Sequence, residues 1–212
     1  MKISNSVMYL AISGLALALV LGGCATVPKA ERYVVAPVGS THTDAVTNTG
    51  SFGSETSQTT TKITERTWEG KRMIAFVSQT GMLLAIPEGK WQAFLGPDNK
   101  PIVSWDPPIG YEFPLEVGKT WTKSYRVTIH PRNQTIPFDN TFKVEAYEDV
   151  TVPAGTFKVF KVTSSDTVGN ENIAWFSPEL GFFVKRMETR TAKHPSGPGT
   201  RASEVISMSI MK

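Results

Sequence analysis

The sequence predicts an all-β fold, an antiparallel sheet that forms an open or partly closed barrel or sandwich. Apolar and polar side chains alternate with a period of two over several segments of the second half. Turn signals containing glycine, proline or asparagine recur at intervals of roughly 8–12 residues. Beyond the N-terminal segment, no window of about a dozen residues has the 3.6-residue period of an amphipathic helix. This combination is typical of β-sandwiches and β-barrels.

The candidate strands begin after residue 55 and number about eleven at this spacing. In the clearest one, Trp121, Tyr125 and Val127 share one face while Thr122 and Thr128 share the other, so this strand is predicted to be buried on one side. The remaining candidates cover residues 61–67, 72–78, 82–86, 91–95, 102–105, 141–146, 157–163, 172–176, 182–191 and 204–211.

Charge and cysteine content exclude some function classes. The chain has 22 Lys and Arg against 19 Asp and Glu, and these residues are spread along the sequence rather than gathered in a basic block. We therefore expect no nucleic-acid partner. The single cysteine excludes an internal disulfide and a cysteine-based zinc site.

Residues 1–23 have the order of a secretory signal peptide. Lys2 is their only charge, an apolar run of about 15 residues follows, and small residues end it. Because a membrane-spanning helix needs about 20 apolar residues, the run is short for an uncleaved anchor helix, which is the alternative. We expect residues 1–23 to be cleaved.

The end of this segment, Leu21, Gly22, Gly23 and Cys24, resembles the lipobox of bacterial lipoproteins. In that motif a diacylglyceryl group alkylates the thiol, and the chain's only cysteine stands where the motif requires it. The resemblance implies a mature chain that begins at an acylated Cys24 and is held permanently in membrane lipid. Ala25 follows in place of the aspartate that retains lipoproteins in the inner membrane, which implies the periplasmic face of the outer membrane.

Residues 24–54 are predicted to be the lipidated cysteine and a flexible tether, and residues 55–212 a single β-rich domain. The tether segment is rich in Ser, Thr and Gly, so it has little apolar surface to bury. As a random coil it would span roughly 30 Å. His42 is interpreted as a solvated tether residue.

Three motifs follow one another between residues 112 and 190, namely FPLEVGKTW at 113–121, VPAGTF at 152–157 and WFSPELG at 175–181. In this order they resemble β-rich bacterial envelope proteins of the TapB-like and related families of unknown function. The resemblance implies an antiparallel β structure and brings no catalytic residue.

The sequence contains no catalytic or metal-ligating motif that we recognise. His42, His130 and His194 are far apart and belong to no metal-binding helix pattern. Neither a G-x-S-x-G elbow nor a Walker loop occurs. We therefore expect no enzymatic activity, no catalytic residue, no metal and no cofactor.

Aromatic residues are concentrated between residues 91 and 121 and are interleaved with prolines. Such residues form either a core or the mouth of an apolar pocket. The predicted ligand or partner surface consists of Trp91, Trp105, Tyr111 and Phe113.

The sequence thus predicts a lipid-anchored envelope protein that acts as a non-enzymatic binding or structural and assembly module, with an envelope protein as its partner. The alternatives are a periplasmic carrier of an apolar ligand and, third, a hydrolase of envelope polymers. A cavity of several hundred Å³ would favour the carrier. A packed interior with an exposed apolar patch would favour a protein partner.

Overall fold

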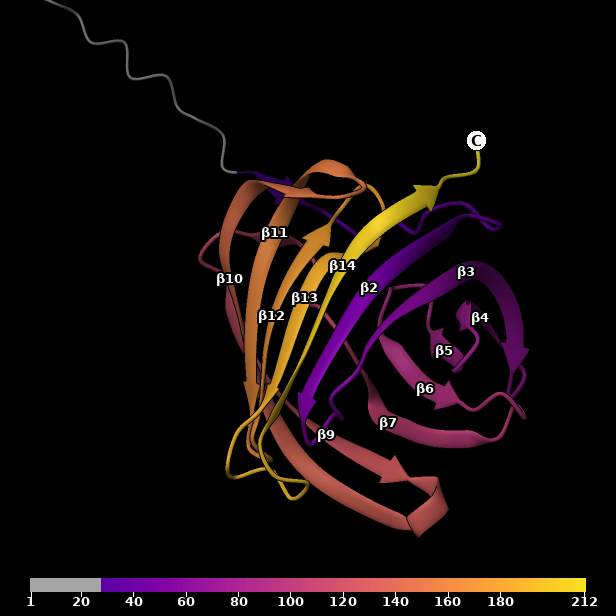
Figure 1. Ribbon diagram of the computed structural model, residues 1–212, viewed down its shortest axis with the longest axis vertical. Helices are drawn as coiled ribbons and strands as arrows, with labels where there is room; N and C mark the ends of the chain where they lie inside the picture. The colour runs from indigo at the N-terminus through magenta and orange to yellow at the C-terminus, as the bar shows by residue number, and fades with distance from the viewer. Residues whose placement is uncertain (1–27) are drawn as a thin grey trace, which may run out of the picture.

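The computed structural model describes residues 28–212 and confirms the all-β fold. Twelve antiparallel strands close into a barrel in the order β10-β11-β12-β13-β14-β2-β3-β4-β5-β6-β7-β9 (Figure 1). A separate two-stranded sheet pairs β1 with β8. The elements are β1 (Lys29–Ala30), β2 (Thr41–Gly50), β3 (Thr56–Trp68), β4 (Lys71–Ser78), β5 (Gly81–Ala85), β6 (Trp91–Leu95), β7 (Pro101–Ile109), β8 (Leu115–Glu116), β9 (Thr120–Ile129), the 3₁₀ turn η1 (His130–Arg132), β10 (Gln134–Val152), β11 (Gly155–Asp166), β12 (Asn170–Ser177), β13 (Phe182–Arg190) and β14 (Gly199–Ser209).

Most strands pair with their neighbours in sequence through short hairpins, as the turn signals predict. The β10–β11 turn falls at Pro153 and Ala154, and Gly155 follows with a positive φ of 139°. The β11–β12 turn is held by the Asp166 carboxylate, which accepts the backbone N–H groups of Val168, Gly169 and Asn170. Among residues 28–212 no helix has the length and apolar character needed to cross a membrane.

Two long-range pairings close the barrel. β14 pairs with β2 along almost its whole length, from Gly199 opposite Gly50 to Ser209 opposite Thr41. β7 pairs with β9 over a short stretch only. The expectation of an open or partly closed sheet is therefore sharpened to a closed barrel.

The position of β2 corrects the flexible tether predicted for residues 24–54. Thr41–Gly50 lies between β14 and β3, and His42, interpreted as solvated, is buried. The segment is rich in threonine, a good strand former, and its alternate residues face the barrel interior. Composition suggested disorder because the strand that pairs with it lies about 150 residues later in the chain. Residues 1–27, with the predicted signal peptide and Cys24, lie outside the described residues.

Residues 31–40, called the strap, run across one end of the barrel. The Ala36 N–H donates to the carbonyl of Leu180 at 3.0 Å, and the Tyr33 hydroxyl donates to the carbonyl of Gly181 at 2.7 Å. Gly181 has a φ of +72°, and a Cβ atom there would lie 1.9 Å from the carbonyl oxygen of Val34. The strap is therefore packed closely onto this end, called the strap end below.

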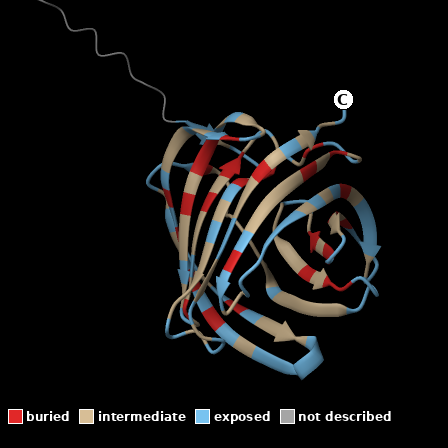
Figure 2. Cartoon of the chain, in the orientation of Figure 1, coloured by how far each residue is buried: buried red, intermediate tan, exposed pale blue. Residues whose placement is uncertain are grey.

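Buried apolar side chains form separate clusters rather than one continuous core (Figure 2). One cluster, around Tyr125 and Phe160, joins β9 to β12, and another, around Met73 and Leu84, joins β4 to β6. A further cluster connects Ala36 of the strap with β13 and β14. Space between the clusters remains open and forms the candidate site.

Candidate functional site: the barrel cavity

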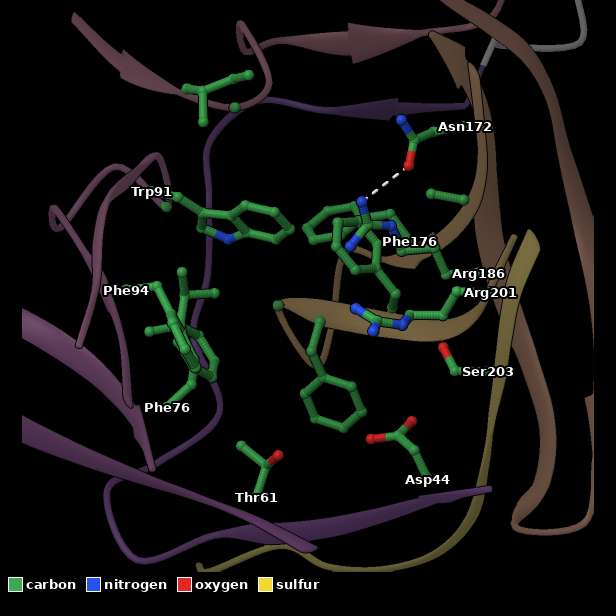
Figure 3. A pocket seen from close by; sticks show the side chains of 18 of the residues that line it. Asp44, Thr61, Phe76, Trp91, Phe94, Asn172, Phe176, Arg186, Arg201 and Ser203 are labelled. Carbon is green, nitrogen blue, oxygen red and sulfur yellow. Dashed lines mark hydrogen bonds between the residues drawn. The ribbon is translucent and has the colours of Figure 1, made fainter. Parts of the chain in front are cut away.

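The barrel encloses a cavity of about 680 Å³ that is lined by inward-facing side chains of most strands (Figure 3). Towards the strap end the lining includes the buried Gly181 and Phe182 and the half-buried Tyr33. The exposed lining residues include Glu55 and Thr80, which lie near the β2–β3 and β4–β5 turns. The cavity is therefore closed by the strap and opens near these turns, at what is called the mouth below.

Aromatic rings line the strap half of the cavity. Tyr111 contacts four rings edge-on, among them those of Phe176 at 5.5 Å and Phe183 at 6.1 Å between centroids. Tyr33 of the strap lies 6.2 Å from Phe113. Burial raises the pKa values of both tyrosines above their ordinary value, so each keeps its proton. The result is a largely apolar half-cavity.

The loop before β8 places two of these rings. Glu112 accepts from Lys90 at 2.8 Å and from Lys123 at 3.0 Å, while Lys119 donates to the carbonyl of Pro114 at 2.7 Å. Burial raises the pKa of Glu112, but the two lysines outweigh it and hold the value below the ordinary range. These contacts fix the loop with its aromatic side chains directed inward.

Three of the four predicted surface residues line the cavity. Trp91, Tyr111 and Phe113 come from β6 and from the loop before β8. Trp105 does not line it, although its ring lies 6.3 Å from that of Trp91 and packs against the same aromatic cluster. The structure thus places the predicted residues together at the interior, and not on an outer face.

Two arginines mark the other half of the cavity. Arg186 of β13 donates to the Asn172 side-chain oxygen at 2.8 Å, and Arg201 of β14 donates to that of Asn48 at 3.0 Å. Figure 3 shows both guanidinium groups reaching towards the lumen. The Arg186 guanidinium also lies 5.3 Å from the ring centroid of Trp91, where a cation–π contact forms. Arginine donors and amide groups thus line part of the lumen, and Arg186 lies directly beside the aromatic rings.

A histidine–aspartate pair lies on the inward face of β2. His42 Nε2 is 3.3 Å from Asp44 Oδ2, and the imidazole stacks on Phe182 at 4.2 Å between centroids. Burial lowers the pKa of His42 to about 4 and raises the pKa of Asp44 to about 6. At neutral pH a neutral imidazole therefore lies beside a carboxylate.

Two buried polar atoms of lining residues have no hydrogen-bond partner within the described part of the chain. They are the Asn140 side-chain oxygen and His42 Nδ1, and both residues are more than nine-tenths buried. A buried acceptor without a donor costs free energy. Such atoms in a cavity wall can accept hydrogen bonds from water or from a bound group.

The geometry offers little support for catalysis. His42 Nδ1 contacts no described hydroxyl that it could activate, and residues 28–212 hold no cluster of three or more potential metal ligands. Ser104 and His130 do form a hydrogen bond of 2.9 Å, but the contact is exposed and lies outside the cavity. The structure orients no described carboxylate onto this histidine, as a catalytic triad requires.

Sequence reasoning missed the polar half of the cavity. His42 and Asp44 were placed in the tether, and Arg186, Arg201 and Asn140 were not singled out. One signal was available, because His42, Asp44 and Asn48 alternate with threonines in the period of a strand.

No protein-family model matches the chain, and no curated protein sequence matches it. Solved structures similar to it include a presumed exported protein with a YmcC-like fold from Bacteroides fragilis NCTC 9343. The two chains are 12% identical, the TM-score is 0.49, and the match covers 84% of this chain and 99% of that one. Another is the hypothetical lipoprotein YmcC from Escherichia coli (K12), at 13% identity and a TM-score of 0.43, covering 81% of this chain and 85% of that one. A presumed lipoprotein from Parabacteroides distasonis ATCC 8503 has 8% identity and a TM-score of 0.42, covering 84% and 99%.

Proposed function

We propose that this protein is a lipid-anchored, non-enzymatic binding protein whose barrel holds an amphiphilic ligand. The cavity of about 680 Å³ carries the proposal, because it falls within the range of 300–1,000 Å³ typical of small-molecule sites. A packed interior would have favoured a purely structural module instead.

The division of the cavity supports an amphiphile over a wholly apolar ligand. Tyr111, Phe176 and Phe183 form a half suited to an alkyl or ring system. Arg186 and Arg201 can donate to acceptor atoms of a polar head, and the unpartnered Asn140 oxygen can accept from a hydroxyl or amide. We therefore expect the ligand's apolar part to lie against these rings and its polar head against the two arginines.

The lipid anchor rests on the sequence. The lipobox at Leu21–Cys24 supports an acylated Cys24, and the signal-like order of residues 1–23 supports export. On this basis we propose a site in the bacterial envelope, on the periplasmic face of the outer membrane. Replacing Cys24 with serine should leave an unlipidated precursor, which mass spectrometry of the purified protein would detect.

Ligand binding can be tested with residues 25–212, which include every strand of the barrel. We expect an environment-sensitive fluorescent fatty acid to gain emission on binding, and native mass spectrometry of the purified protein to show a bound amphiphile. Ala174→Phe, on the inward face of β12, should reduce binding at least about tenfold by filling the cavity.

Ile173→Phe is the matched control, because Ile173 is the neighbouring residue on the same strand and does not line the cavity. It should bind the probe like the unmodified protein. Equal binding by both variants, or no binding by the unmodified barrel to any amphiphile, would contradict the proposal.

A further inference from the structure

Exposed apolar side chains gather at the strap end of the barrel. Five large apolar residues within residues 28–212 are markedly exposed, and four of them, between 40% and 54% exposed, lie at this end; they are Val34, Val38, Val117 and Met211. Val34 and Val38 belong to the strap, and Val117 directly follows β8, whose partner β1 leads into the strap. Met211 lies against Gly39 and donates its N–H to Ser40 at 3.0 Å.

We propose that this strap-end patch rests on the surface of the lipid bilayer to which the chain is attached, so that the barrel stands end-on with its mouth facing away from the membrane. The inference depends on the proposed acylation of Cys24. Large apolar side chains that are exposed at one end of a domain indicate an interaction surface, and the position of Cys24 indicates which surface lies nearest.

The length of chain ahead of the barrel limits its orientation. Cys24 precedes Pro28 by four residues, and four residues span at most about 14 Å in any conformation. The described chain enters the barrel at the strap end (Figure 1). A ten-residue strand such as β2 is about 33 Å long. The barrel therefore cannot point its mouth at the bilayer while Cys24 is inserted in it, which leaves an end-on and a side-on arrangement.

The patch decides between an end-on and a side-on arrangement. The fifth exposed apolar residue, Met187 on β13, lies on the barrel wall opposite Ile173 of β12, so the described wall carries one markedly exposed large apolar residue against four at the strap end. Charges near the strap end have both signs, with Lys29 paired to Glu31 at 3.1 Å, and Glu116 and Lys212 also exposed. We therefore expect contact with zwitterionic lipid, driven by apolar area and by the high effective concentration that the anchor imposes.

The orientation can be measured on the full-length lipidated protein in phosphatidylcholine vesicles. Because the only native cysteine is at position 24 and would carry the lipid, a second cysteine can be labelled selectively. Val38→Cys places a fluorophore in the patch, and Ser54→Cys places one in the β2–β3 turn at the mouth end. We expect a lipid-borne nitroxide quencher to quench the Val38 probe at least threefold more than the Ser54 probe.

A second set of variants tests the same contact without a label at position 38. With the probe at Val117→Cys, the substitution Val38→Asp should reduce quenching at least twofold, because a carboxylate opposes insertion of the patch. Met187→Asp, on the barrel wall, should leave quenching unchanged.

The outcomes separate this inference from the proposed anchor. Mass spectrometry that finds no acyl groups on Cys24 would overturn the anchor, and the orientation with it. A lipidated protein with equal quenching at Val38 and Ser54 would overturn the orientation alone.

Discussion

At the scale of single residues, burial shifts the pKa values of His42 and Asp44 in opposite directions, so their effects on the pH dependence of stability oppose each other. Burial lowers the pKa of His42 from 6.5 to about 4 and raises that of Asp44 from 3.8 to about 6. Between pH 4 and 6 the folded pair therefore holds one proton, as the unfolded pair does. Because stability changes with pH only when the two states bind different numbers of protons, the intact pair contributes almost no slope.

Replacing either residue should expose the pH dependence of stability that the other residue causes. In Asp44→Asn, the depressed pKa of His42 means that the unfolded chain binds more protons, so stability should fall as the pH decreases from 6.5 to 4. In His42→Phe, which preserves an aromatic ring against Phe182, the raised pKa of Asp44 should make stability fall as the pH rises from 3.8 to 6. Each slope should approach about 1.4 kcal/mol per pH unit.

Urea unfolding at several pH values across this window measures both slopes. The intact protein is the reference, since its other titratable groups are shared by both variants. Slopes of the same sign in the two variants would show that burial does not control the titration of this pair.

Gly181 is the residue that lets the strap approach the barrel. Alanine there would place a Cβ atom 1.9 Å from the Val34 oxygen, in addition to the cost of a positive φ. Gly70→Ala is a matched control, because Gly70 has a similar φ of +75° and no neighbour within 4 Å. We expect Gly70→Ala to lower the free energy of unfolding by about 1–2 kcal/mol and Gly181→Ala by about 1–3 kcal/mol more. Equal losses in chemical denaturation would show that the strap is easily displaced.

At the scale of elements, the wall from β5 to β9 is the most weakly paired part of the barrel. β7 and β9 pair only between Val103–Asp106 and Arg126–Ile129, and the pairing of β6 with β7 is equally short, whereas β10 and β11 pair from Asn140 to Val152. Local opening should therefore begin on either side of β7. Hydrogen exchange followed by mass spectrometry should show faster exchange for a peptide covering β7 than for one covering β11. Equal protection would mean that the wall opens only as a unit.

The elements themselves could be predicted to different degrees. β9 was clear because Trp121 and Tyr125 alternate with polar residues, and the β10–β11 turn was clear because proline and glycine restrict its backbone. β2 was missed because its threonines and glycine resemble a linker when its partner β14 is not known. Whether a segment forms a strand depends mainly on its local sequence, whereas the strand that it pairs with can lie far away in the chain.

The residues of the candidate site also differ in how far they could be predicted from the sequence. Tyr111 and Phe113 could be predicted because aromatic residues near prolines stand out in a sequence. Arg186 and Arg201 could not be predicted, because an arginine on an alternating strand is ordinarily solvated. They face the lumen only because β13 and β14 curve into a closed wall, and closure is a property of the whole molecule.

At the scale of the whole molecule, the pairing of β2 with β14 has a consequence for how the protein is made. β2 lacks one of its two neighbouring strands until β14 has been synthesised. The barrel wall therefore cannot close on a partial chain. Contacts between residues so distant in sequence also make folding slow. Until then both β2 and the growing chain end present unpaired edges, which attract other strands. A chain that emerges gradually, from a ribosome or through a membrane, therefore needs protection for the whole time of its emergence.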